Sequence, residues 1–192
     1  MTVDAAAWTT LAAVREYLNL PTNEVDRDTF IENLINRSYK VLEAYIGKTI
    51  KSATYTEYYD GDGTDTLLVD QWPIISITSL NEDVSRDFLG DTAIDATDIL
   101  IYAKEGRIVL YADEYAFSIG KQNIKIVYVA GYADIPADLA LAALMHVSSI
   151  YNLAGADGHV GMSLGGLSKS IDTAPLSDKL RLLLEPYRKR AT

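Results

Sequence analysis

Residues 123–153, NIKIVYVAGYADIPADLALAALMHVSSIYNL, are the most informative part of the chain because they pass from a strand pattern to a helix pattern. Ile124, Ile126 and Tyr128 occupy alternate positions and so fall on one face of an extended strand. Pro136 stands where the first turn of a helix accepts a proline, and the residues after it are apolar on nearly every side. The stretch predicts a strand that leads into a helix buried in a bundle or packed on two sides.

The chain before this stretch predicts short strands separated by turns. The β-branched and aromatic runs are ATYTEYY (53–59), TLLVD (66–70), PIISITSL (73–80), ILIYA (99–103) and IVLYA (108–112). The first two runs flank DGDGTD (60–65) and the last two flank KEGR (104–107), so each pair predicts a hairpin. Residues 81–98 are acidic and weakly patterned, and we expect a loop with some local structure there.

Helical periodicity returns at both ends of the chain. Thr9 or Thr10 can cap a short helix, and a stronger helix is expected from about Asp28 until Gly47 stops it. Ser177 can cap a last, leucine-rich helix. The chain thus predicts an α+β fold: a small bundle of about four helices with an antiparallel β-module inserted between the second and third. The expected parts are 1–50 (N-terminal helical part), 51–131 (acidic β-module) and 132–192 (C-terminal helical part), forming one continuous domain with an insertion.

Acidic charge is concentrated in the β-module. The whole chain has 17 Lys and Arg against 27 Asp and Glu, a net charge of −10. Residues 55–120 hold fourteen acidic and three basic side chains, a balance of −11, so the remainder carries +1. Such a chain is a poor general binder of nucleic acid, which requires an excess of Lys and Arg. The charge distribution indicates a physically distinct module.

Reactive constellations are missing from the sequence. It contains no Cys and only two His, of which His146 falls among apolar helix residues and His159 in a glycine-rich stretch. DGDGTD (60–65) lacks the spacing and the flanking helices of a calcium-binding EF-hand. We therefore expect no enzymatic activity, no catalytic residue, no cofactor and no metal. No run approaches the ~20 apolar residues of a membrane span, and MTVDAAAWTT at the start lacks a signal-peptide pattern, so we expect a soluble, intracellular protein without a membrane partner.

Five segments, in this order, resemble a known family. They are TTLAAVREYLNLP (9–21), LEAYIGKTI (42–50), YYDGDGTDTLLVDQWPIISITSL (58–80), VYVAGYADIPADLALAALMHV (127–147) and SIDTAPLSDKLRLLLEPYRKR (170–190). The chain is similar to the head–tail connector (adaptor, or head-completion) proteins of tailed bacteriophages over nearly its whole length. Residues 81–99 match least.

The resemblance implies a structural role without catalysis. Such adaptors are made in the host cytoplasm and form a ring, commonly of twelve copies, beneath the portal protein in the neck of the virion. They extend the DNA channel, let genomic DNA pass without specific binding, and dock the next neck or tail protein. We expect a monomer or weak association in isolation and a ring on the partner. Residues 155–166, rich in glycine, are expected to form a loop that becomes ordered on assembly.

The resemblance also suggests two sets of site residues. By position, the C-terminal segment would contact the portal, with Tyr187, Arg188, Lys189 and Arg190 as candidates. The alternative is a basic tail that only complements the dipole of the last helix. Acidic side chains facing a channel would repel passing DNA, with Asp60, Asp62, Asp65, Asp83, Asp87 and Asp91 as candidates. The alternative is that these carboxylates lie on solvated outer loops.

Two other function classes stay open at this point. One is a different neck or tail component, such as a stopper or a tail terminator. The other is a small binding module outside phages.

Overall fold

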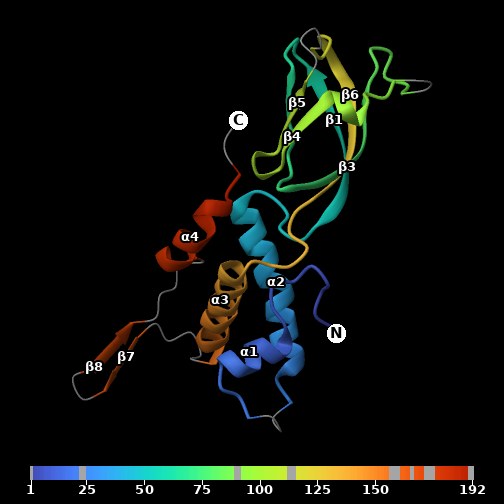
Figure 1. Ribbon diagram of the computed structural model, residues 1–192. Helices are drawn as coiled ribbons and strands as arrows, with labels where there is room; N and C mark the ends of the chain where they lie inside the picture. The colour runs from blue at the N-terminus through green and yellow to red at the C-terminus, as the bar shows by residue number, and fades with distance from the viewer. Residues whose placement is uncertain are drawn as a thin grey trace. The chain divides into compact units, whose positions relative to one another are not determined.

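The computed structural model describes residues 2–21, 25–88, 92–111, 116–155, 161–164, 167–170 and 176–189. The chain divides into two compact units, a helical unit formed by residues 1–48 and 134–192 and a β-unit formed by residues 49–133. Figure 1 shows helices and strands, with the strands of the β-unit between α2 and α3 in the chain and the pair β7–β8 between α3 and α4. The predicted α+β fold is confirmed. The expectation of one continuous domain with an insertion stays a prediction.

The helical unit contains the four α-helices of the described residues. They are α1 (Leu11–Tyr17), α2 (Asp28–Ile46), α3 (Ala137–Gly155) and α4 (Asp178–Leu184), followed by the 3₁₀ turn η3 (Glu185–Tyr187). Thr10 accepts a hydrogen bond from the N–H of Ala13, and Ser177 accepts one from the N–H of Leu180. Gly47 ends α2 in the left-handed conformation, with φ of 82°. The caps and the C-terminal stop are therefore confirmed.

The core of the helical unit forms where α1, α2 and α3 pack together. Val14 of α1, Ile31 and Ile35 of α2 and Val147 of α3 are buried in one cluster. By length and composition alone, residues 137–154 of α3 pass as a membrane span, so the expectation that no such stretch exists is wrong. Helix α3 contacts α1, α2 and α4, and 33% of this stretch is buried in the structure.

The β-unit contains two antiparallel three-stranded sheets. The first has the order β1 (Ala53–Gly61), β6 (Gly120–Ala130), β3 (Ile74–Glu82), and the second has the order β2 (Thr66–Leu68), β5 (Arg107–Leu110), β4 (Ile99–Tyr102). The 3₁₀ turns η1 (Ala96–Asp98) and η2 (Ala103–Glu105) flank β4. The predicted hairpin around residues 104–107 is confirmed, since β4 pairs with β5.

The predicted hairpin of residues 53–70 is wrong, because β1 and β2 belong to different sheets. The buried side chain of Asn123, on β6, provides the physical reason. Its Oδ1 accepts a hydrogen bond from the N–H of Gly61 (2.8 Å), and its Nδ2 donates to the carbonyl of Ser118 (2.8 Å). A Cβ on Gly61 would lie 2.0 Å from that carbonyl oxygen, so only glycine fits there. These contacts hold the end of β1 against β6 rather than β2.

A buried polar network stabilises the β-unit beside its apolar core. The hydroxyl of Tyr128, on β6, donates to Glu57 Oε2 of β1 at 2.7 Å, and the hydroxyl of Tyr59 donates to the same oxygen. The two hydroxyl oxygens in turn accept the backbone N–H groups of Gln71 (3.1 Å) and Asp70 (2.8 Å). Burial, and then the bond to Glu57, raises the pKa of both tyrosines far above the ordinary value of 10.0.

Part of the glycine-rich stretch is extended backbone. Strands β7 (Gly161–Leu164) and β8 (Leu167–Ser170) pair as an antiparallel hairpin, with Met162 opposite Lys169. The expectation of a loop over residues 155–166 is therefore wrong for β7. Residues 156–160, which include His159, and residues 165–166 lie outside the described residues.

The network predicts alkaline destabilisation. Below pH 10 the tyrosines are neutral in both the folded and unfolded states, so their stabilisation is fully present. Above pH 10 the unfolded tyrosines ionise while the folded ones stay protonated, and the free energy of unfolding falls as pH rises. Tyr128→Phe removes two hydrogen bonds, the one donated to Glu57 and the one accepted from the N–H of Gln71, and we expect a loss of about 1–3 kcal/mol at neutral pH and a shallower decline above pH 10.

Urea unfolding on both sides of pH 10 measures this effect. Tyr111→Phe is the matched control, because Tyr111 is 67% exposed. Equal stability and equal alkaline slopes in the two variants would contradict the role given to the network.

Candidate functional site

The residues that the sequence nominates lie in two places, the C-terminal segment of the helical unit and the turns of the β-unit. In the C-terminal segment, the hydroxyl of Tyr187 donates to both carboxylate oxygens of Asp138, at 2.7 and 2.9 Å. Asp138 lies in the first turn of α3, where a negative charge is favoured by the helix dipole. Tyr187 is half-buried, so this contact fixes the segment to the start of α3.

Arg188 and Lys189 lie at the C-terminal end of α2. The guanidinium of Arg188 is 5.6 Å from the ring centroid of Tyr45 and 3.6 Å from the carboxylate of Glu185. The backbone N–H of Lys189 donates to the carbonyl of Ile46 at 2.7 Å, which satisfies one of the carbonyls left open at a helix end. The helix that these residues complement is therefore α2, not the last helix considered from sequence. Arg190 lies outside the described residues.

Asp62 and Asp65 organise the turn between β1 and β2. The carboxylate of Asp62 accepts hydrogen bonds from the N–H and the hydroxyl of Thr64, at 2.9 and 2.7 Å. Both bonds lower the pKa of Asp62 below its ordinary value, and the bond from the Thr64 hydroxyl has the larger effect. Asp65 accepts from the hydroxyl of Thr66 at 2.9 Å. Both residues are exposed and both act on the local backbone.

Asp60 fixes the start of β6. Its Oδ2 lies 2.7 Å from the Lys121 ammonium, and its Oδ1 accepts the N–H of Gln122 at 2.8 Å. The hydrogen bond from Lys121, followed by that from Gln122, lowers the pKa of Asp60.

Asp83 fixes the loop that follows β3. Its Oδ1 accepts the N–H and the hydroxyl of Ser85, at 2.8 and 2.6 Å, and its Oδ2 accepts the N–H of Phe88 at 2.8 Å. The pKa of Asp83 falls well below its usual range, chiefly through the Ser85 hydroxyl. Asp87 is exposed in the same loop, and Asp91 lies outside the described residues.

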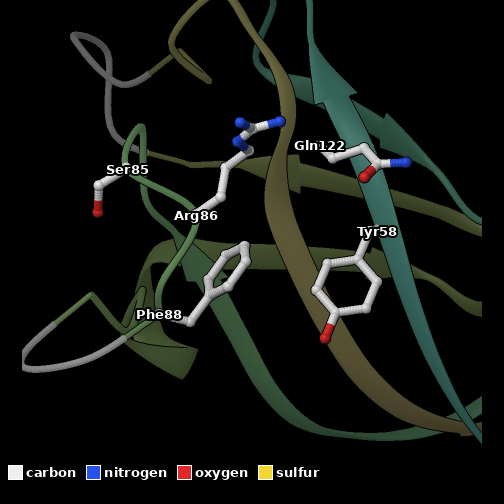
Figure 2. Close-up of a pocket in the computed structure, with 5 residues that line it drawn as sticks. All are labelled: Tyr58, Ser85, Arg86, Phe88 and Gln122. Carbon is white, nitrogen blue, oxygen red and sulfur yellow. The ribbon is translucent and has the colours of Figure 1, made fainter.

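The loops held by Asp60 and Asp83 meet at a hollow of about 350 Å³, which we call the aromatic cup. Its lining residues are Tyr58, Ser85, Arg86, Phe88 and Gln122. Figure 2 shows the rings of Phe88 and Tyr58 on one side, with Arg86 extending beside them toward Gln122. The two ring centroids are 5.6 Å apart. The only sequence signal near this site is the Asp-x-Ser pattern of a turn at residues 83–85.

The structure brings Asp60 and Asp83 to one site, and it gives Asp60, Asp62, Asp65 and Asp83 local bonding partners. That these side chains line a channel stays a prediction. Among the described residues, no group of three His, Asp or Glu side chains is placed to hold a metal ion. His146 is buried within α3.

Comparison with known proteins gives one family and several similar folds. The family model described as "Head completion protein" matches residues 7–190. None of the curated proteins compared with the chain matches it.

Three solved structures contain chains with the same fold. In the neck of an empty gene transfer agent (GTA) particle computed with C6 symmetry, the similar chain has a TM-score of 0.61 and 16% identity, and the match covers 100% of this chain and 95% of that one. In the virion of the native GTA particle, the similar chain has a TM-score of 0.63 and 18% identity, and the match covers 100% of this chain and 95% of that one. In the neck of the native particle computed with C12 symmetry, the similar chain has a TM-score of 0.61 and 17% identity, and the match covers 100% of this chain and 94% of that one.

The hydrogen bonds of Asp83 predict the order of its loop. Asp83→Asn puts an N–H group where the carboxylate accepts N–H donors, so we expect several-fold faster amide hydrogen exchange at Ser85 and Phe88. In the wild type, this protection should be present above pH 3.8 and be lost as pH falls, because the folded-state pKa is depressed.

Asp98→Asn is the control, with the same change of charge in the same unit. Nuclear magnetic resonance measures the exchange rates. Equal rates in the two variants would show that Asp83 does not hold the loop.

Proposed function

Because this chain belongs to the head completion protein family, we propose that it is a head–tail connector in the neck of a phage-like particle. In this proposal it forms a ring beneath the portal protein, extends the DNA channel and docks the next neck or tail component. The match over residues 7–190 carries the proposal, since it includes both units of the chain. The role is structural, and no catalytic step is assigned to it.

The similar folds support the proposed location and symmetry. Two of them come from necks of GTA particles, computed with C6 and with C12 symmetry. A ring of twelve copies is compatible with both symmetries. The partners in this proposal are further copies of the chain, the portal protein and the next neck or tail protein.

The negative charge of residues 55–120 supports the proposal that DNA passes through the ring without binding to it. Residues 55–120 carry a balance of −11, and a ring would repeat that charge around its axis. Asp62 and Asp65 are exposed carboxylates without a basic partner among the described residues, whereas Asp60 is paired with Lys121. In a channel-facing orientation, Asp62 and Asp65 would therefore contribute more to repulsion of DNA than Asp60.

The C-terminal segment is the proposed contact with the portal. Tyr187 and the backbone of Lys189 fix the segment to α3 and α2, so it projects its basic side chains from one place. Arg188 is exposed. Lys189 and Arg190 follow it in the sequence, so the basic run is three residues long. A fixed basic surface suits recognition of carboxylates on a partner at low entropic cost.

Cryo-electron microscopy of the protein mixed with a candidate portal tests the ring. The expected result is a closed ring of this chain on the portal, with the C-terminal segment at the contact. Absence of ring density on the portal would overturn the connector role.

Charge removal at the C-terminal segment tests the portal contact separately. The double variant Arg188→Gln, Lys189→Gln removes two positive charges, one exposed and one half-buried, and we expect roughly tenfold weaker association with the portal. Truncation is unsuitable, since residues 187–189 also bind α2 and α3.

The matched control is the double variant Lys179→Gln, Arg181→Gln, which removes the same charge from exposed positions of α4. Surface plasmon resonance measures both variants. Equal affinities would assign the portal contact to another surface while leaving the ring untouched.

A further inference from the structure

Backbone strain is concentrated at the aromatic cup. Within the described residues, four residues other than glycine have a positive φ angle. Three of them line the cup, with φ of 63° at Arg86, 52° at Phe88 and 50° at Gln122. Side chains with a Cβ rarely adopt this conformation, and such residues cluster where a structure holds a functional group in place.

The strained residues are held by carboxylates rather than by packing in the core. Asp83 binds the N–H of Phe88, and Asp60 binds the N–H of Gln122. Arg86, Gln122 and Tyr58 nevertheless remain exposed. The hydrogen bonds thus stabilise an open surface of fixed shape.

The cup carries positive charge without a neutralising partner. Arg86 is exposed, and among the described residues no hydrogen bond or ion pair satisfies its guanidinium. The ammonium of Lys125 lies 5.6 Å from the ring centroid of Phe88 and 6.0 Å from that of Tyr58. Of the carboxylates in these loops, Asp60 and Asp83 are already engaged with Lys121 and with the loop backbone, and Asp87 is exposed next to Arg86 in sequence.

Two aromatic rings beside unneutralised cations fit a carboxylate next to an apolar side chain. A second copy of this chain offers such groups, because residues 49–133 of its β-unit hold fourteen acidic and six basic side chains, a balance of −8. Neighbouring copies in a ring would repel each other through these charges, and a cationic contact would reduce that repulsion. Val84, 70% exposed in the loop of the cup, adds apolar surface to this face.

We infer that the aromatic cup is a contact between neighbouring copies of this chain, where Arg86 and Lys125 receive a carboxylate from the acidic β-unit of the next copy. This inference rests on the proposed ring. Duplex DNA is the less suitable occupant, because the β-unit holds fourteen acidic and six basic side chains and its overall charge therefore repels phosphates.

Self-association of the full chain at low ionic strength tests the contact. We expect dilution to shift the nuclear magnetic resonance signals of Arg86, Phe88 and Gln122, and Arg86→Gln to weaken association about fivefold, as for one exposed ion pair. The control is Arg107→Gln, which removes the same charge from the same unit. Arg107 already has partners, since its guanidinium is 3.8 Å from the ring centroid of Tyr102 and pairs with Glu105.

Three results would overturn the inference. The first is a wild-type spectrum that is independent of concentration at the cup. The second is equal association of the Arg86→Gln and Arg107→Gln variants. The third is a larger shift of the same signals with duplex DNA than with a second copy.

Ring formation on the portal separates this inference from the proposed function. If the wild type and Arg86→Gln assemble rings equally well, the cup is not the contact and the connector role stands. If the wild type forms no ring, the connector role fails, and the dilution series still decides whether copies meet at the cup.

Discussion

The β-unit depends on one carboxylate, that of Glu57. It accepts hydrogen bonds from a tyrosine of its own strand, Tyr59, and from Tyr128 of the neighbouring strand β6. The same two hydroxyls bind the backbone of residues 70 and 71, which connect β2 of the second sheet to β3 of the first. A half-buried charge is tolerated only when such partners surround it. One side chain therefore joins both sheets, and the turns beyond them are built on this frame.

Elements with local signals were predictable from sequence, and those that depend on distant partners were not. Thr10, Gly47 and Ser177 mark helix ends within a few residues, so the bounds of α2 and α4 followed directly. The β-branched and aromatic composition identified β1 and β2 as strands, but the turn between them predicted the wrong pairing. The partner of β1 is more than sixty residues away in sequence, and Asn123 selects it through hydrogen bonds that no local pattern announces.

In the candidate sites too, features with a local sequence signal were predictable, and features that depend on distant partners were not. Charge counting located the acidic residues, but it does not show what a carboxylate accepts, and Asp60 and Asp83 turned out to hold loops. Arg86 and Phe88 have no intrinsic preference for the left-handed conformation, so the aromatic cup had no sequence signature. The basic C-terminal residues were nominated by resemblance alone, and their attachment to α2 and α3 follows from contacts between segments far apart in the chain.

The two units differ in how they are encoded, and this affects the order of folding during synthesis. Residues 49–133 form the β-unit as one continuous segment, whereas the helical unit combines residues 1–48 with residues 134–192. The carbonyl of Ile46 receives its hydrogen bond from Lys189, which is translated 143 residues later. On the ribosome, the β-unit therefore has all its strands before the helical unit has all its helices. A nascent chain would present its acidic module first and acquire the basic side chains of residues 188–190 only later in translation.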